Sequence, residues 1–213
     1  CRRMGISSPV LAVGSALDAS RYDVKIVDAR LEPQAVDRVL AECDDALCLG
    51  ITVLTGAPIG DALHVLRAVR RAYPRLPTIC GGWHPSLFAV EMLEEPTIDI
   101  TVQGQGEATF AELVAKLAQG MAPTDVPGLT YRDANGAHRN PPRPLLEMDS
   151  LPAPDYDLIE VERYFELKGT RQLDYIASVG CPFRCAFCAA PFVYHRGWKG
   201  ISALRLGEQI ERL

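Results

Sequence analysis

The sequence has no apolar run near the roughly 20 residues that a membrane-spanning helix needs, and no basic stretch precedes a signal-like segment. It has no excess of basic charge either: the formal net charge is −5 and the pI is about 5.4. Such a balance leaves no broad positive field for nucleic acid. The seven cysteines are too few and too unevenly spread for a secreted disulfide scaffold. We therefore expect a cytoplasmic protein with no membrane span and no nucleic-acid partner.

The amino-acid composition is otherwise that of an ordinary globular protein. Of its 213 residues, 48% are hydrophobic and 23% are charged, which suffices for one full core and part of a second. The chain starts at Cys1 and stops at Leu213 inside the amphipathic pattern SALRLGEQIERL. We expect that it is an excerpt of a longer protein.

Helix-like and strand-like segments alternate from residue 9 onward. Strands are predicted at 23–28, 46–54, 78–80 and 98–102, and helices at 9–19, 34–43, 61–73, 89–93 and 107–118. The run ALCLGITVL is apolar almost throughout, as expected of a strand buried on both faces, and Cys48 and Cys80 are predicted to pack in the core. This alternation predicts an α/β fold with a Rossmann-like, doubly wound parallel sheet that binds ligands at the carboxyl ends of its strands.

The composition changes near Gly120, where a proline-rich stretch begins. Residues 128–140 predict a small hairpin, with Asn135-Gly136 suited to a type I′ turn, and the prolines after it predict an extended connector. The apolar segment DYIASVG then leads into a cysteine cluster. We therefore predict a first domain at 1–120 that lacks its N-terminal strand, a connector at 121–170, and the start of a second domain at 171–213.

The cysteine cluster has the arrangement CxxxCxxC, formed by Cys181, Cys185 and Cys188. Thiolates hold iron–sulfur clusters, and three of them can occupy three corners of a cubane while the fourth iron stays open to another ligand. Gly180 and Pro182 favour an irregular loop over a helix, which suits a chain that wraps a metal centre.

Two other interpretations of the three cysteines remain open. A zinc site could form from the same cysteines and His195, although structural zinc motifs usually pair their cysteines in two separated knuckles. In a helix the three side chains would instead share one buried face, but Gly180 and Pro182 make a helix a poor fit. Disulfides among the three cysteines are disfavoured by the expected cytoplasmic location. Spacing alone favours an iron–sulfur cluster over both.

The pattern CxxxCx(aromatic)C directly after an apolar strand resembles the signature of the radical-SAM superfamily. The resemblance implies a [4Fe–4S] cluster on Cys181, Cys185 and Cys188, whose open iron chelates S-adenosylmethionine, with Phe187 beside the adenine. It further implies that reductive cleavage of S-adenosylmethionine yields a 5′-deoxyadenosyl radical, and that an external donor of flavodoxin or ferredoxin type supplies the electron.

Residues 10–120 resemble the cobalamin-binding domain of class B, B12-dependent radical-SAM proteins, a group that includes methyltransferases and the anaerobic magnesium-protoporphyrin IX monomethyl ester cyclase. The matching pieces are LCLGITVLTGAP, CGGWHPS and DITVQGQGEATF, and the connector piece DVPGLTYRDANGAHRNPPRP matches as well. The resemblance implies bound cobalamin and a fold in which the Rossmann-like domain precedes the truncated start of a partial (β/α) TIM-type barrel.

The candidate cobalamin contacts lie where three predicted strands run out into loops. The first strand end offers hydroxyl groups and an apolar wall. The glycines at the second strand end let a flat ring or a phosphate approach the backbone. The residues at the third strand end precede a helix whose free N–H groups favour an anion. The residues are Thr52, Leu54, Thr55, Gly81, Gly82, Gly104, Gly106 and Glu107.

Two motifs near these residues have weaker alternatives. GQGEAT is not the GxGxxG of a dinucleotide fingerprint and follows a late strand, so a metal-free nucleotide binder is the least specific interpretation. His84 could be an axial cobalt ligand, but the sequence shows no DxHxxG motif, and a structural role in a turn is the stronger interpretation. Residues 194–199 resemble the family segment that often reads GRxWRxRSPE, although Ile201, Ala203 and Leu204 depart from it.

The activity that the resemblance implies is radical methyl transfer to an unactivated carbon of a small-molecule substrate. The catalytic residues stay unassigned, and we expect these 213 residues alone to be inactive. A radical oxidative cyclisation of the anaerobic cyclase type is the alternative reaction. The alternative outside the enzymes is a non-catalytic cobalamin-binding module.

Overall fold

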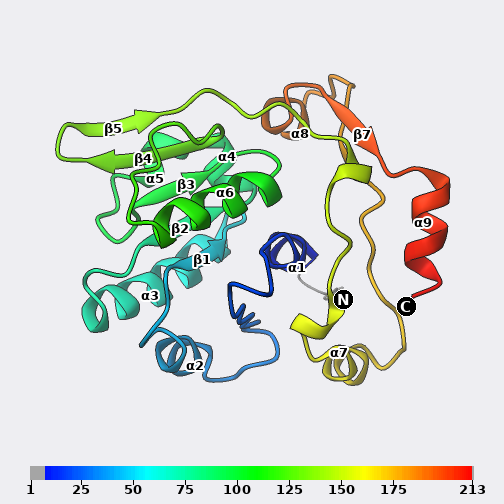
Figure 1. The fold of residues 1–213 in the computed structure, drawn as a ribbon, viewed down its shortest axis with the longest axis horizontal. Helices are drawn as coiled ribbons and strands as arrows, with labels where there is room; N and C mark the ends of the chain where they lie inside the picture. Colours follow the sequence, from blue (N-terminus) through cyan, green and yellow to red (C-terminus); the bar gives the residue numbers. More distant parts are fainter. Residues whose placement is uncertain (1–7, 213) are drawn as a thin grey trace.

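The structure is a computed structural model that describes residues 8–212; residues 1–7 of the predicted first domain, and Leu213, lie outside the described part. Its centre is one five-stranded sheet in the order β1-β2-β3-β4-β5 (Figure 1). The strands are β1 (Leu49–Thr52), β2 (Thr78–Gly81), β3 (Ile100–Val102), β4 (Leu129–Asp133) and β5 (Gly136–Arg139). The first three are parallel to one another, and β4 and β5 are antiparallel to their neighbours. The sheet is therefore mixed, with a parallel core.

Helices cover both faces of the parallel strands. They are α1 (Ser8–Ser15), α2 (Ala35–Ala41), α3 (Ala57–Ala72), α4 (Trp83–Leu87), α5 (Ala89–Met92) and α6 (Glu107–Ala118). Successive side chains of a strand point to opposite faces, so Cys80 packs with Leu66 of α3 in one core while Ile79 packs with Leu113 of α6 in another. The predicted α/β fold with helices on two faces of a parallel sheet is confirmed.

The hairpin β4–β5 belongs to the sheet. Strand β4 pairs with β3, and Val126 and Leu129 are fully buried against Ile79 and Leu113, so the sheet continues past residue 120. The predicted type I′ turn is wrong. Asp133 pairs with Gly136, which places the turn at 134–135, and only Gly136 has a positive φ there, of +117°.

The predicted strand at 23–28 is not a strand of the sheet. Residues 23–27 form no regular element, and none of the described strands pairs with them. Val24 and Ile26 instead pack against α1, where their side chains lie 3.4 and 3.3 Å from the position that a Cβ at Gly14 would take. The alternation of residue types predicts a strand here, but a strand also needs a neighbour with free hydrogen-bonding groups.

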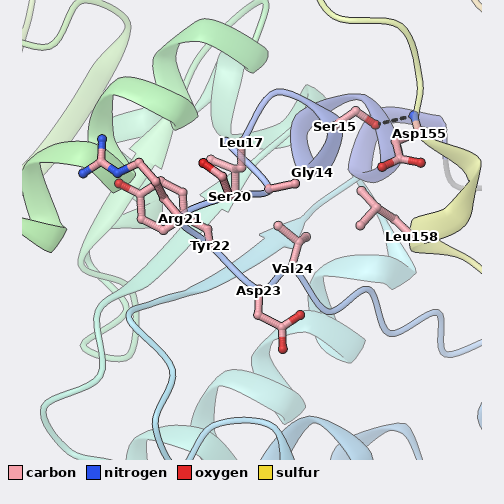
Figure 2. Close-up of a pocket in the computed structure, with 11 residues that line it drawn as sticks. Gly14, Ser15, Leu17, Ser20, Arg21, Tyr22, Asp23, Val24, Asp155 and Leu158 are labelled. Atoms are coloured by element: carbon pink, nitrogen blue, oxygen red, sulfur yellow. Dashed lines mark hydrogen bonds between the residues drawn. The ribbon is translucent and has the colours of Figure 1, made fainter.

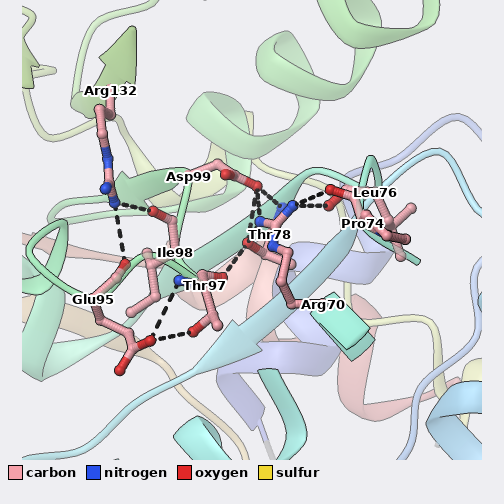
Figure 3. A network of polar contacts seen from close by, with 9 residues as sticks. All are labelled: Arg70, Pro74, Leu76, Thr78, Glu95, Thr97, Ile98, Asp99 and Arg132. Carbon is pink, nitrogen blue, oxygen red and sulfur yellow. Dashed lines mark hydrogen bonds and ion pairs between the residues drawn. The ribbon is translucent and has the colours of Figure 1, made fainter. Parts of the chain in front are cut away.

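A polar network closes the amino-terminal end of the sheet, as Figure 3 shows. One carboxylate oxygen of Asp99 accepts hydrogen bonds from the Thr78 backbone N–H at 2.8 Å and from Arg70 of α3 at 2.6 Å. Arg132 of β4 donates to the carbonyl of Ile98 at 2.8 Å. These charged hydrogen bonds tie α3, β2, β3 and β4 together at the edge opposite the carboxyl ends of the strands.

Residues 141–212 form a long arm beside the sheet (Figure 1). Its elements are the 3-10 turns η1 (Met148–Ser150) and η2 (Tyr156–Leu158), the helices α7 (Val161–Lys168), α8 (Ala190–Val193) and α9 (Ala203–Ile210), and the strands β6 (Ser178–Gly180) and β7 (Trp198–Gly200). The predicted strand before the cysteines is present but short, and β6 pairs antiparallel with β7. The start of a parallel barrel stays a prediction. None of the helices between Ser8 and Arg212 is both long and apolar enough to cross a bilayer.

Candidate functional site

The three parallel strands end side by side, so the loops that follow them form one continuous edge. Thr52 of β1 is in register with Gly81 of β2. Beyond the strands, the Val53 N–H donates to the Gly81 carbonyl at 2.8 Å, and the His84 N–H donates to the Val53 carbonyl at 3.0 Å. These two hydrogen bonds hold the loop after β1 against the loop after β2.

Gly82 is required for this close approach. Its φ is +97°, and a Cβ at this position would lie 2.8 Å from the Thr52 hydroxyl oxygen and 3.2 Å from the Val53 carbonyl oxygen. Any larger residue would push the two loops apart, because a Cβ does not tolerate contacts this short and L residues rarely adopt this φ. The approach of a flat ring or a phosphate to Gly81-Gly82 stays a prediction, and the close approach that the structure shows at Gly82 is to the neighbouring loop.

The loop after β1 presents its side chains outward. Thr52, Leu54 and Thr55 are all exposed, and Leu54 keeps 52% of its surface accessible although it follows the fully buried Val53. The Thr55 hydroxyl lies 3.2 Å from Nδ1 of His84. An exposed leucine flanked by hydroxyl groups gives the edge an apolar patch with hydrogen-bonding groups on either side.

The loop after β3 is held to the loop after β2 by Ser86. The Ser86 hydroxyl donates to the Gly82 carbonyl at 2.7 Å and accepts from the Gly104 N–H at 2.9 Å. Gly104 has a φ of +71°, and a Cβ there would meet only the Val193 carbonyl, at 3.6 Å. Gly104 thus keeps its backbone open on the side where a side chain would otherwise project.

The residues that follow Gly104 differ in role. The carboxamide oxygen of buried Gln105 accepts from the Leu146 N–H at 2.8 Å and so fastens the connector to the sheet. Gly106 has an ordinary φ of −88° and caps the N-terminus of α6. Glu107, the first residue of α6, has a raised carboxyl pKa because it is largely buried, and that burial outweighs the hydrogen bonds from the backbone N–H groups of Gly106 and Glu107.

The cysteine loop is an exposed, irregular turn between β6 and α8. Cys185 is exposed, Cys181 and Cys188 are half-buried, and the Cys188 N–H donates to the Cys185 carbonyl at 3.1 Å. In the part of the chain that the structure covers, no three His, Cys, Asp or Glu side chains converge closely enough to hold a metal, whether or not His195 is included. Phe187 is 92% exposed. The non-helical loop agrees with the effect expected of Gly180 and Pro182, and the donor set of three thiols suits a cluster.

The backbone around this loop is tightly constrained. Gly180 has a φ of +84°, and a Cβ there would overlap the Gly197 carbonyl oxygen. His195 and Arg196 have positive φ values of 49° and 60°, a conformation that costs a non-glycine residue about 1–2 kcal/mol. Two such residues in succession turn the chain sharply, so that β7 returns beside the residue that precedes Cys181.

Two hollows in the described part of the chain lie away from these residues. One, of about 470 Å³, lies at the C-terminal end of α1 and is lined by residues of 14–24 together with Asp155 and Leu158 (Figure 2). There the Asp155 N–H donates to the Ser15 hydroxyl at 2.8 Å. The other, of about 710 Å³, lies between the connector, α7 and α9. We place the candidate site at the strand ends because the constrained glycines and exposed hydroxyl groups gather there.

Sequence reasoning missed three residues of this edge. Ser86 bridges two strand ends, and the signal was its position four residues after Gly82, where a hydroxyl can reach back to the carbonyl. Trp83 of α4 meets Tyr194, at the end of α8, edge to face with ring centroids 5.9 Å apart. No local pattern could reveal that contact, because it joins residues from the two predicted domains.

Comparison with known proteins finds matches that span the whole chain. The family model described as the B12 binding domain matches residues 5–114. An uncharacterised methyltransferase of Pyrococcus horikoshii is 31% identical over the whole of this chain, which covers 47% of that relative. The anaerobic magnesium-protoporphyrin IX monomethyl ester cyclase of Synechocystis is 28% identical over 94% of this chain and 41% of its own length. The chain thus spans less than half the length of these relatives.

Among solved structures, the radical S-adenosylmethionine methyltransferase TsrM of Kitasatospora setae, with cobalamin and a [4Fe-4S] cluster bound, matches with a TM-score of 0.78. The match covers all of this chain and 44% of that one, at 18% sequence identity. At this level of identity the match shows a shared fold. Its extent shows that the arm of residues 141–212, as well as the sheet, has a counterpart there.

Proposed function

The chain belongs to the B12-binding domain family, its relatives being cobalamin-dependent radical-SAM proteins, and on this premise we propose that its strand-end edge binds cobalamin within a radical-SAM enzyme. One observation carries the proposal. Exposed Thr52, Leu54 and Thr55 face a loop system whose backbone is fixed by two positive-φ glycines, Gly82 and Gly104.

The chemistry of this edge suits cobalamin. The nucleotide tail of cobalamin is long and partly apolar, and it carries a phosphate, so it requires an open backbone, hydroxyl groups and an apolar wall. Gly104 supplies open backbone, Thr52 and Thr55 supply hydroxyl groups, and exposed Leu54 supplies apolar surface. When bound, cobalamin supplies a transferable methyl group.

The cysteine loop suits a [4Fe–4S] cluster by its donor set. Cys181, Cys185 and Cys188 place three thiols within eight residues of a loop that is neither helical nor buried, so the thiols can turn toward a common centre. When bound, the cluster supplies the electron that cleaves S-adenosylmethionine. We propose that exposed Phe187 covers the adenine, and that an external flavodoxin- or ferredoxin-type donor reduces the cluster.

We propose methyl transfer to an unactivated carbon of a small molecule as the reaction of the whole protein. A relative named as a methyltransferase aligns over the full chain, and the Synechocystis cyclase aligns over 94% of it. Both kinds of enzyme would need the same two cofactor sites. Residues beyond this chain would therefore choose between them.

The cobalamin half of the proposal is tested with a matched pair of glycine variants. Gly104→Ala and Gly120→Ala introduce the same strain, because the two glycines have φ values of +71° and +67°, but only Gly104 lies at the strand ends. We expect the wild-type chain and Gly120→Ala to bind aquacobalamin alike, and Gly104→Ala to lose about tenfold in affinity, measured by absorbance titration. Equal loss in both variants, or no binding by the wild type, would contradict the proposal.

The cluster half is tested by anaerobic reconstitution with iron and sulfide, with and without cobalamin. We expect the wild type and the buried-cysteine variant Cys43→Ala to take up iron and sulfide in equal amounts. The triple variant Cys181→Ala/Cys185→Ala/Cys188→Ala should take up neither. Metal in the triple variant, or a lone zinc ion in the wild type, would overturn the cluster assignment.

A further inference from the structure

Residues from the cysteine-loop side of the molecule pack directly on the proposed cobalamin edge. Tyr194 follows Cys188 by six residues, and its ring meets the edge of Trp83 at an interplanar angle of 87°. Trp83 is the first residue of α4 and follows Gly82 directly. The contact therefore joins the chain that leaves the cysteine loop to the loop that follows β2.

The backbone beside Tyr194 also reaches the loop after β3. The Val193 carbonyl lies 3.6 Å from the position that a Cβ at Gly104 would take, and the Val193 side chain is only 6% exposed. The pKa of the half-buried Tyr194 hydroxyl is raised by burial and, to a smaller extent, by the negative charge of Glu107. Val193 and Tyr194 thus lie against residues from two of the three strand ends.

The neighbours of this pair in the sequence do not share its burial. Phe192 is 73% exposed, and His195 and Arg196 are exposed with left-handed backbone. Consecutive left-handed residues persist only where the surroundings fix them. The packing of Tyr194 on one side and the β6–β7 pairing on the other supply that constraint. Tyr194, together with Val193, therefore fastens the chain after the cysteine loop to the loops at the strand ends.

We infer that Tyr194 is a positioning residue that couples the two proposed cofactor sites. Its ring, seated on Trp83, fixes the backbone after Cys188 against the loops that would hold cobalamin, so occupancy of one site stabilises the arrangement needed by the other. This inference rests on the proposed function. It makes cobalamin affinity depend on the cluster and, by thermodynamic linkage, cluster affinity depend on cobalamin by the same factor.

The test is a comparison of cobalamin affinity with and without the cluster. In the wild-type chain we expect the cluster-loaded form to bind aquacobalamin more tightly than the cluster-free form, by a factor of about 5–150. In Tyr194→Leu the ratio should fall to about one, while each cofactor still binds alone. Tyr194→Phe, which keeps the ring, and Phe192→Leu, at an exposed neighbour, should retain the wild-type ratio.

A variant on the other side of the contact guards against misfolding of Tyr194→Leu. Trp83→Leu removes the partner ring and should likewise reduce the affinity ratio to about one. The double variant Trp83→Leu/Tyr194→Leu should show the same ratio as either single variant. A wild-type ratio of one, or a ratio unchanged in both single variants, overturns the coupling while leaving the proposed function intact. Failure of the wild-type chain to bind cobalamin at all overturns both.

Discussion

The sheet region (residues 49–140) and the cysteine-loop region (residues 171–212) differ in how they are held together. The sheet region has two apolar cores with fully buried residues such as Leu66, Ile79 and Leu113. In the cysteine-loop region Phe187 is almost entirely exposed, and Leu204 on α9 is also largely accessible. Burial of apolar surface dominates stability, so the sheet region is stabilised from within.

The cysteine-loop region is stabilised from outside, by polar contacts with the connector. Lys199 forms an ion pair with Glu147, the Ser202 N–H donates to Asp149 at 2.8 Å, and Arg205 donates to the Leu151 carbonyl. Such contacts fix position but add little net stability, because exposed ion pairs are screened by water. The comparison teaches that order in this region depends on its neighbours, which suits a loop that we propose to wrap around a cluster.

The largest expected difference is in the cost of removing a large side chain. Leu113→Ala leaves a cavity in a core with no solvent access, and we expect a loss of about 2–5 kcal/mol in the free energy of unfolding. Phe187→Ala removes a side chain that buries almost nothing and should change stability by less than about 0.5 kcal/mol. Urea denaturation of both variants measures this. Similar losses would show that the loop is packed in solution.

A smaller effect is expected from backbone constraint within the cysteine-loop region. Gly180→Ala places a Cβ on the Gly197 carbonyl, and we expect a local loss of at least about 1–3 kcal/mol as β6 and β7 separate. Gly207→Ala, in α9 with nothing near the new methyl group, should gain about 0.5–1 kcal/mol. Hydrogen exchange should rise at 178–200 in the first variant and leave β1–β3 unchanged. Uniformly faster exchange would mean that the two regions unfold as one.

The smallest effect concerns a charge at the strand ends. Burial raises the Glu107 pKa in the folded chain, so the folded state binds a proton more readily than the unfolded state and gains stability as the pH falls. At pH 7 that gain is absent, and Glu107→Gln should raise Tm slightly, with the difference shrinking on acidification. Glu208→Gln, on the exposed surface of α9, is the control and should leave Tm unchanged at every pH. A lower Tm for Glu107→Gln would show that the carboxylate is stabilising.

The parts of the fold that were predicted are those with local causes. The helix at 107–118 was predicted with the same first and last residue that the structure shows, because its apolar positions recur at helical spacing after the helix-breaking Gly104 and Gly106. Apolar runs likewise located β1, β2 and β3, although β1 and β3 are shorter than their predicted ranges and β2 is one residue longer. Periodicity shows which face is buried, and pairing decides where a strand ends.

The parts that were not predicted depend on contacts between distant residues. The segment at 23–28 alternates like a strand but has no partner strand in the described chain, and the turn at 134–135 follows the pairing of Asp133 with Gly136. At the candidate site, the sequence predicted the positions of the glycines. It could not predict why residue 82 must be glycine, because the atoms that a side chain there would meet belong to the neighbouring loop. The contact of Tyr194 with Trp83 could not be predicted either, because the two residues are far apart in the sequence.

The pairing of the hairpin with β3 has a practical consequence for anyone who shortens this chain. A version ending at residue 120 would lose Val126, Leu129 and Tyr131 from the core around Ile79 and would bare the hydrogen-bonding edge of β3. Bare sheet edges recruit other chains, so such a version should self-associate. A version ending at 140 keeps that edge covered, and is the better starting point for growing crystals of the sheet.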